Sequence, residues 1–418
     1  MTKSKEQTVK DLLGENGLCP QPWSQFEIQD NKFLACCQTL PRSWITKQKD
    51  FLSPNDQTIS LDDIVNNPQM NELRKTMMEG QWPESCKRCQ MTEKGGLVSQ
   101  RLRKPIPINF NDRITRTDAD GRYDFEKKDF GTFEIHLGNE CNQKCLYCSP
   151  RASNLLLEEH KEYFGDSSEY FVEDTNWYVD SKIWDKLIEH GITEMIFEGG
   201  EPLFNKNHRF ILEKLIDGKI SHEIRLIYTT NLMPLSKKMI DLWDNFEYVQ
   251  LTVSLDGTHD HQNYIRYLSD YNRVMENINS LIGSRKIRFK FNSVLTVYNS
   301  FNTVDLYHEL LSFDCPTVEE SSFIRSSPVS GHKFYSIRVL PPELKEEVKN
   351  YWSEQQANSP LTGKRKETLD RLIQGNLTYM MGEDWSHLWP EFIRFTKFFD
   401  AKRSLDFTKV DPRFIPYM

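Results

Sequence analysis

The sequence predicts an α/β fold in which six βα units form the middle of the chain. Short runs rich in β-branched and aromatic residues alternate there with amphipathic helical patterns. The strands expected from these runs span residues 133–137, 194–198, 224–229, 249–254, 288–295 and 320–324. Strands that alternate with helices pair in parallel, and such sheets carry their functional residues at the carboxyl ends of the strands.

The segments on either side of these units have a different character. Residues 1–130 hold most of the cysteines and finish in a charged, turn-rich stretch, which predicts a small cysteine-rich module followed by a linker. We assign the α/β core to residues 131–340 and a helical extension to 341–418. In the extension Phe392, Phe395 and Phe399 share one helical face, which predicts packing against the core.

Two local signals mark the starts of helices. Asn67 and Pro68 have the character of an N-cap and a first helical position, and Gly80 is placed to end that helix. Ser236 is a plausible N-cap before the apolar residues that begin at Met239.

Composition favours a cytoplasmic enzyme. No apolar run approaches the ~18 residues that a membrane span needs, and the polar N-terminus lacks the apolar core of a signal peptide. A net charge of −8 disfavours binding to a nucleic-acid backbone. The nine cysteines, an odd number set at metal-ligand spacings, indicate metal sites in a reducing compartment.

The most informative motif is the loop that follows the first expected strand, where Cys141, Cys145 and Cys148 are spaced Cx3Cx2C. Three thiolates can ligate three irons of a [4Fe–4S] cluster and leave the fourth iron open to a cosubstrate. Zinc is the alternative, although structural zinc usually takes four ligands from paired CxxC units.

Residues 138–150 resemble the cluster loop of the radical S-adenosylmethionine (radical SAM) superfamily, including the aromatic Tyr147 before the third cysteine. The resemblance implies a partial (β/α)6 TIM-like barrel with its cluster loop after the first strand. It also implies that the open iron binds S-adenosylmethionine (SAM) as cosubstrate.

Motifs at later strand ends extend this resemblance. Residues 199–202 match the family's GGEP motif, while Leu232 stands where the family often has glycine after Thr-Asn, and the GxIxxxG pattern of the fifth strand is absent. The SAM contacts that the resemblance implies are Gly199, Gly200, Glu201, Pro202, Asn231, Ser254, Asp256, Arg266, Asn292 and Val294. Among them Ser254 and Arg266 are expected to grip the SAM carboxylate, because a guanidinium fork matches two oxygens; an ordinary surface arginine is the alternative.

The N-terminal cysteines resemble the twitch or SPASM module of the same superfamily. The expected ligands of an auxiliary [4Fe–4S] cluster are Cys19, Cys36, Cys86 and Cys89. Cys37 could exchange with Cys36, and Asn31 stands where the module pattern has glycine. Two separated cysteine pairs also suit tetrahedral zinc. The module precedes the barrel here, whereas in the family it usually follows.

The resemblance implies an enzyme that cleaves SAM reductively and removes hydrogen from a substrate. A peptide or protein side chain, oxidised or cross-linked, is the first candidate, and a sugar, aminocyclitol or nucleotide is the second. A flavodoxin or ferredoxin is the expected electron donor. A non-catalytic iron–sulfur electron carrier is the alternative of a different class. Glu198, Asp260 and Arg325 are candidates to face the barrel mouth, and no residue stands out as a general base.

Overall fold

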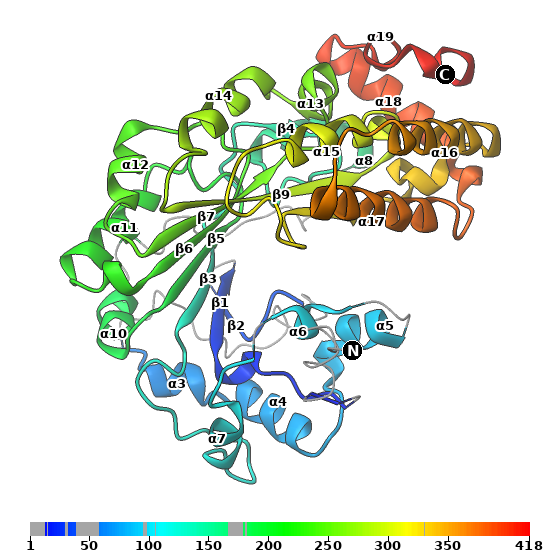
Figure 1. Ribbon diagram of the computed structural model, residues 1–418. Coiled ribbons are helices and arrows are strands. Elements are labelled where there is room, and N and C mark those ends of the chain that lie inside the picture. The colour runs from blue at the N-terminus through cyan, green and yellow to red at the C-terminus, as the bar shows by residue number, and fades with distance from the viewer. Residues whose placement is uncertain are drawn as a thin grey trace.

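A single twisted sheet organises the protein (Figure 1). The computed structural model describes residues 13–14, 16–29, 32–38, 58–94, 98–104, 106–165, 179, 182–329 and 331–418. The sheet has the order β10-β9-β7-β6-β5-β3-β1-β2, and every neighbouring pair is parallel except β1 with β2. Its strands are β1 (Gln25–Gln29), β2 (Lys32–Leu34), β3 (Thr132–His136), β5 (Glu194–Glu198), β6 (Arg225–Thr230), β7 (Tyr248–Ser254), β9 (Ile287–Leu295) and β10 (Ile324–Pro328).

Five of the six strands expected for the core are confirmed to within one residue at each end. The sixth prediction, 320–324, was wrong, because the strand β10 begins only at Ile324. The residues before it form turns instead, with Glu320 N donating to Thr317 O at 2.9 Å and Phe323 N donating to Glu320 O at 3.0 Å. The α/β fold class, with a parallel sheet like that of a partial TIM barrel, is confirmed.

Helices cover the outer face of the sheet (Figure 1). They include α10 (Ile183–His190), α11 (His208–Asp217), α12 (Lys237–Trp243), α14 (Tyr271–Leu281) and α15 (Thr303–Leu311). The helices α8 (Leu157–Phe164) and α13 (His259–Ile265) pack on C-terminal residues instead, with ring centroids 5.2 Å apart for Tyr163 and Phe395 and for Tyr264 and Phe407. Ser236 caps α12 as expected, since its side chain accepts a hydrogen bond from Met239 N.

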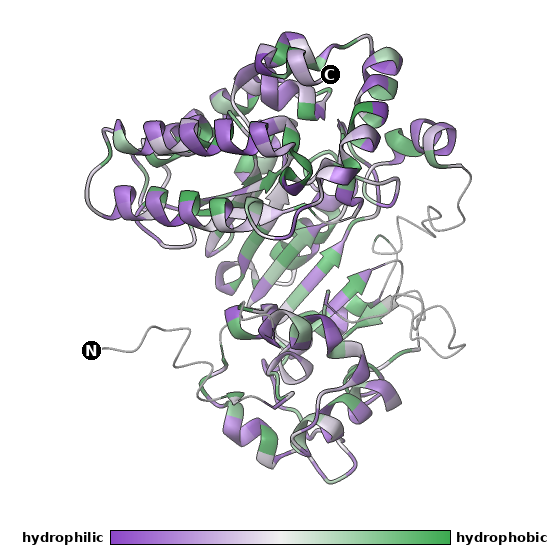
Figure 2. Cartoon of the chain, turned by 90° about the vertical axis from the view of Figure 1, so that its right-hand side faces the viewer, coloured by the Kyte–Doolittle hydropathy of each residue, from purple (hydrophilic) through white to green (hydrophobic). Residues whose placement is uncertain are grey.

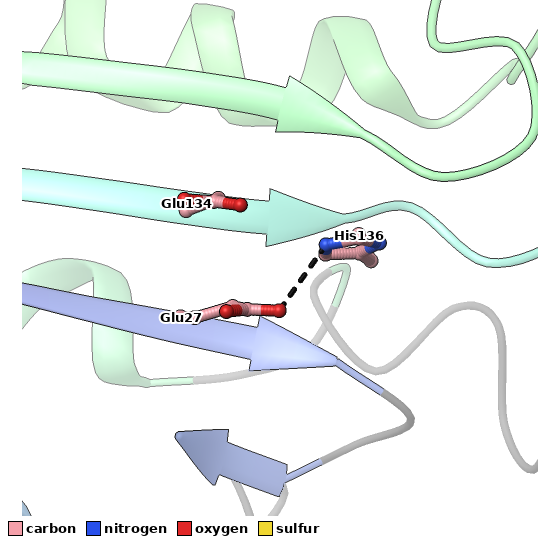
Figure 3. Close-up of side chains that lie close together, drawn as sticks. All are labelled: Glu27, Glu134 and His136. Carbon is pink, nitrogen blue, oxygen red and sulfur yellow. Dashed lines mark ion pairs between the residues drawn. The ribbon is translucent and has the colours of Figure 1, made fainter. Parts of the chain in front are cut away.

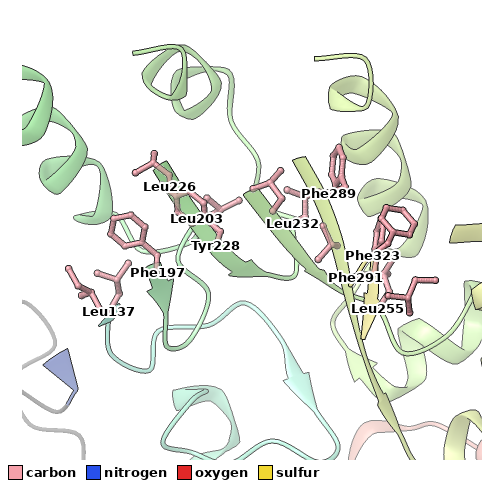
Figure 4. Packing of buried hydrophobic residues seen from close by; sticks show 14 of the residues in the cluster. Leu137, Phe197, Leu203, Leu226, Tyr228, Leu232, Leu255, Phe289, Phe291 and Phe323 are labelled. Atoms are coloured by element: carbon pink, nitrogen blue, oxygen red, sulfur yellow. The ribbon is translucent and has the colours of Figure 1, made fainter. Parts of the chain in front are cut away.

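The hydrophobic core lies between this helical layer and the sheet (Figure 4). Phe197 of β5 stacks on Tyr228 of β6 with ring centroids 5.1 Å apart, and Phe289 and Phe291 of β9 are buried beside them in the same layer. The alternate residues of the strands are mainly polar and point to the other face, as Glu134, Glu198 and Asn292 do, so hydrophobic and hydrophilic colours alternate along the strands in Figure 2. The two-residue period therefore separates an apolar outer layer from a polar interior.

The N-terminal module contributes strands to the sheet of the core, which the sequence did not predict. β1 pairs in parallel with β3, and Glu27 lies opposite Glu134 in the register. The helices of the module are α3 (Leu61–Val65), α4 (Pro68–Met78), α5 (Lys87–Lys94), α6 (Gln100–Arg103) and α7 (Phe110–Thr115). The expected helix start is confirmed, because the Asn67 side chain accepts from Met70 N at 2.9 Å.

Buried arginines join the parts of this module. Arg74 of α4 is fully buried and donates to Gly121 O at 2.7 Å, Pro22 O at 3.0 Å and Val65 O at 2.7 Å, besides two asparagine side chains. The segment 101–129, which we expected as a linker over the surface, is thus packed into the module in its described residues. Arg113 of α7 reinforces this, donating to Trp23 O at 2.7 Å.

The C-terminal extension is helical, as expected, with α16 (Pro342–Ala357), α17 (Gly363–Met380), α18 (Trp389–Arg403) and α19 (Phe407–Val410). The aromatic face of α18 packs inward, since Phe392, Phe395 and Phe399 are all buried. From the end of α18, Arg403 pairs with Glu159 at 2.8 Å, and Glu159 also pairs with Lys144 in the cysteine loop. Within the described residues, no helix has the length and apolar character to cross a membrane.

We expect Arg74→Ala to lower the free energy of unfolding by about 3 kcal/mol, because several buried acceptors lose their donor at once. Arg122→Ala is the matched control: it removes an exposed ion pair with Asp62 and should change that free energy by less than about 1 kcal/mol. Urea denaturation followed by tryptophan fluorescence measures both, and equal losses would contradict the structural role given to Arg74.

Candidate active site

The three loop cysteines line one cavity of about 380 Å³ at the carboxyl ends of the strands. The loop leaves β3 and folds back in β4 (Lys144–Cys145), which pairs antiparallel with β8 (Arg266–Tyr267) and places Cys145 opposite Arg266. Burial and the neighbouring Cys145 raise the pKa of Cys141 and of Cys148 to about 12. At neutral pH these thiols therefore keep their protons unless a bound metal replaces those protons.

The turn of residues 199–202 lies directly against the cysteine loop. Gly200 N donates to Gly138 O and Glu201 N to Glu140 O, both at 2.8 Å. A Cβ atom on Gly200 would lie 2.1 Å from Glu140 O, and Gly199 has a φ of +117°. Only glycine permits so close an approach of the two backbones. Both glycines are therefore needed where the end of β5 contacts the cysteine loop.

Glu201 is buried and ties two strand ends together. Its carboxylate accepts hydrogen bonds from Thr230 Oγ1 at 2.6 Å, Asn231 N at 2.6 Å and Leu203 N at 3.0 Å. Burial raises the pKa of Glu201 to about 7, although these donors oppose the rise. The Asn231 side chain in turn donates to Asn142 Oδ1 in the cysteine loop at 2.7 Å.

Arg266 is fixed on two sides within the site. Its Nε donates to Asp256 Oδ2 at 2.7 Å, and its Nη2 donates to Tyr147 Oη at 2.6 Å. Tyr147 also donates to Asp256. The third nitrogen, Nη1, lies 3.9 Å from Cys145 Sγ and donates to it. The guanidinium is thereby held beside a ligand-type thiol, where its charge favours the thiolate.

Most of the SAM contacts implied by the resemblance lie around this cavity. Those that line it are Gly199, Gly200, Glu201, Asn231, Ser254, Arg266, Asn292 and Val294. Pro202 and Asp256 do not line it; Asp256 lies behind, where it also accepts from Val294 N at 2.7 Å. Of the three residues considered for the barrel mouth, Glu198 lines the cavity, whereas Asp260 and Arg325 are exposed elsewhere.

Other lining residues were not singled out from the sequence. They include Gln29, His136, Gln143, Arg151, Ser153 and Thr229. Gln29 and His136 come from β1 and β3, and the alternation of apolar and polar residues in those strands was the only signal that could have placed them inside. The Asn292 Oδ1 atom is buried and has no hydrogen-bond partner among the described residues, which leaves an acceptor directed at the cavity.

The N-terminal cysteines form a second group. Cys19, Cys36, Cys86 and Cys89 line a common small cavity, and Cys37 does not. Burial raises the pKa of Cys19 to about 12 and that of Cys86 to about 11. Arg101 borders the same cavity, stacked 4.7 Å from the Trp82 ring and paired with Glu93. Asn31 lies outside the described residues, so its expected place in the pattern is not tested.

Comparison with known proteins agrees with this geometry. Residues 135–304 match the model of the Radical SAM superfamily. The chain is 28% identical over 253 residues to the "Probable GTP 3',8-cyclase" of Methanocaldococcus jannaschii, covering 60% of this chain and 70% of that protein. It is 28% identical over 162 residues to the "Molybdenum cofactor biosynthesis protein 1" of Dictyostelium discoideum, covering 38% of this chain and 23% of that protein.

Solved structures were also compared. Streptococcus suis SuiB bound to S-adenosylmethionine has a TM-score of 0.36 and 14% identity, covering 64% of this chain and 58% of that one. Native anSMEcpe with bound AdoMet has a TM-score of 0.35 and 18% identity, covering 53% of this chain and 60% of that one. The chain therefore spans about three fifths of each of these neighbours. The matched segment, residues 135–304, contains the three loop cysteines and is a radical SAM domain within this chain.

Proposed function

We propose that this protein is a radical SAM enzyme whose active centre is the cavity around Cys141, Cys145 and Cys148. The observation that carries the proposal is the convergence of three thiols and the buried Arg266 on one cavity at the strand ends. Three thiols suit a [4Fe–4S] cluster with one iron left for SAM. When both are bound, they supply reductive cleavage of SAM to methionine and a 5′-deoxyadenosyl radical that removes hydrogen from an unactivated carbon.

Thiol spacing supports iron–sulfur clusters over zinc at both cysteine sites. Zn–S bonds of about 2.3 Å in a tetrahedron bring the sulfurs about 3.8 Å apart. Among the described residues, only Glu27, Glu134 and His136 bring three ligand atoms of His, Cys, Asp or Glu within 4.8 Å of one another. No three cysteine sulfurs of either group meet this limit. Neither cysteine group is packed tightly enough for a single ion, whereas a cluster offers its irons at separate corners.

Different residues around the cavity suit different chemical groups of SAM. We assign the SAM carboxylate to Ser254 and Arg266, which both line the cavity; the hydrogen bonds of Arg266 to Asp256 and Tyr147 preorganise its guanidinium and support this assignment. The turn of Gly199 and Gly200 offers backbone to the amine. Asn292 offers an unsatisfied acceptor to a hydroxyl of the ribose.

We also propose that Cys19, Cys36, Cys86 and Cys89 ligate an auxiliary [4Fe–4S] cluster. Full ligation by four thiolates fits electron transfer rather than substrate binding. An acceptor of this kind favours oxidation or cross-linking of a peptide or protein side chain. A flavodoxin or ferredoxin would supply the reducing electron, and the nine free cysteines fit a reducing compartment such as the cytoplasm. A nucleotide is the second candidate substrate, favoured by the similarity to a probable GTP cyclase.

We expect Cys145→Ala to abolish 5′-deoxyadenosine formation, because it removes a cluster ligand and the thiol beside Arg266. The assay is anaerobic reconstitution with iron and sulfide, reduction with dithionite, and chromatography of the products from SAM. Cys315→Ala, which removes a buried thiol outside both sites, should retain activity. SAM cleavage by the Cys145 variant would overturn the assignment, and iron-loaded wild-type protein without SAM cleavage would favour an electron carrier.

We expect Cys86→Ala to lower bound iron from about eight to about four atoms per chain while 5′-deoxyadenosine is still formed. The separate cavities of the two cysteine groups make this independence possible. Iron, sulfide and zinc analysis of the variant beside wild type measures it. Unchanged iron together with loss of zinc would assign the N-terminal site to zinc instead.

A further inference from the structure

A cluster of metal-ligand-type side chains lies on the polar interior face of β1 and β3, beside the cavity of the loop cysteines. It consists of Glu27, Glu134 and His136, whose ligand atoms all lie within 4.8 Å of one another. Figure 3 shows the three side chains converging from the two adjacent strands. His136 Nε2 lies 3.3 Å from Glu27 Oε1, and Glu27 is opposite Glu134 in the strand register. We call these residues the carboxylate–histidine cluster.

Glu27 is the residue that the structure leaves unexplained. Its side chain is 0% exposed, and neither carboxylate oxygen has a hydrogen-bond partner among the described residues. A buried carboxylate without donors is strongly unfavourable unless a cation or a proton neutralises it. Apart from the ion pair of Oε1 with His136, which a shared metal ion would replace, both oxygens of Glu27 are available to a ligand inside the cluster.

The surroundings add negative rather than positive charge. Glu198 Oε2 lies 3.8 Å from His136 Nε2, and Cys37 is near enough for its charge to act on Glu134. Burial and these negative neighbours raise the pKa of Glu134 to about 10. Lys104 Nζ lies 3.9 Å from Glu134 Oε2. Despite this lysine the pKa of Glu134 stays raised, so its carboxyl keeps a proton unless a further cation binds.

We propose that the carboxylate–histidine cluster binds a divalent transition-metal ion. Two carboxylates and an imidazole are ligands of the kind that Mn²⁺, Fe²⁺ and Zn²⁺ accept, and the compact spacing of their donor atoms suits one ion rather than an iron–sulfur cluster. No thiol is required for this set, so the site is distinct from both cysteine sites.

The position of the cluster indicates what such an ion would act on. His136 and Glu198 line the 380 Å³ cavity, so an ion bound here lies at the edge of the active site. Oxygen donors would complete its coordination, either water or a carboxylate or phosphate of the substrate. The site therefore favours substrates that carry an anionic oxygen group.

The test uses the full chain with its clusters reconstituted, stripped of loose metal with EDTA and titrated with MnCl₂. Free Mn²⁺ is followed by electron paramagnetic resonance, and Mn²⁺ is chosen because it prefers oxygen and nitrogen ligands to thiolates. We expect the wild type to bind a single Mn²⁺ ion, and Glu27→Gln and Glu134→Gln each to weaken binding at least tenfold. His261→Gln, which removes a histidine 3.5 Å from Asp411 elsewhere in the chain, should bind as wild type does.

A second readout separates ligation from a fold defect. Glu27→Gln removes the unbalanced buried charge, so its melting temperature without Mn²⁺ should be at or above that of the wild type. Mn²⁺ should raise the melting temperature of the wild type and leave that of the variant unchanged. Wild-type protein that binds no Mn²⁺, or a Glu27 variant that binds it equally well, would overturn the proposal whatever the outcome for SAM cleavage.

Discussion

The parallel pairing of β1 with β3 is the contact on which the arrangement of the functional groups depends. β3 leads directly into the cysteine loop, and β1 leads through β2 toward Cys36. One set of ladder hydrogen bonds therefore links the two cysteine groups through a shared sheet. A module attached by a flexible linker would leave their separation free to vary, whereas strand pairing fixes both the distance and the register.

The same pairing creates the main electrostatic problem of the interior. Successive side chains of a strand point to opposite faces of the sheet. Phe26 and Phe133 are paired and point outward. The next pair, Glu27 and Glu134, therefore points inward with its two side chains next to each other. Elsewhere the protein neutralises buried carboxylates with arginine, as Arg266 does for Asp256 and Arg403 does for Glu159. Glu27 has no such partner among the described residues beyond His136, which is why a cation explains the cluster better than the protein alone does.

Much of the core could be predicted from the sequence because its signals are local. The strands of the middle segment, the caps at Asn67 and Ser236, and the cysteine loop each follow from residues close together in the chain. β1 could not be predicted in this way, since it forms a strand by pairing with β3, which lies more than a hundred residues further along the chain. Tyr147 illustrates the same limit at the site: its aromatic character was evident, but its bonds to Asp256 and Arg266 arise only from tertiary folding.

The two cysteine groups and the carboxylate–histidine cluster differ in the distance between their ligand atoms, and the backbone elements that carry them set that distance. The N-terminal cysteines come from separate segments and the other three from one loop, and each group surrounds a cavity, which suits a polynuclear centre. The carboxylate–histidine cluster comes from two paired strands, and directly paired residues bring their side chains close together. A loop-built site with wide spacing and a strand-built site with close spacing can therefore coexist within one interior. Donor type and distance together favour iron–sulfur clusters at the proposed cysteine sites and a single ion at the proposed carboxylate–histidine site.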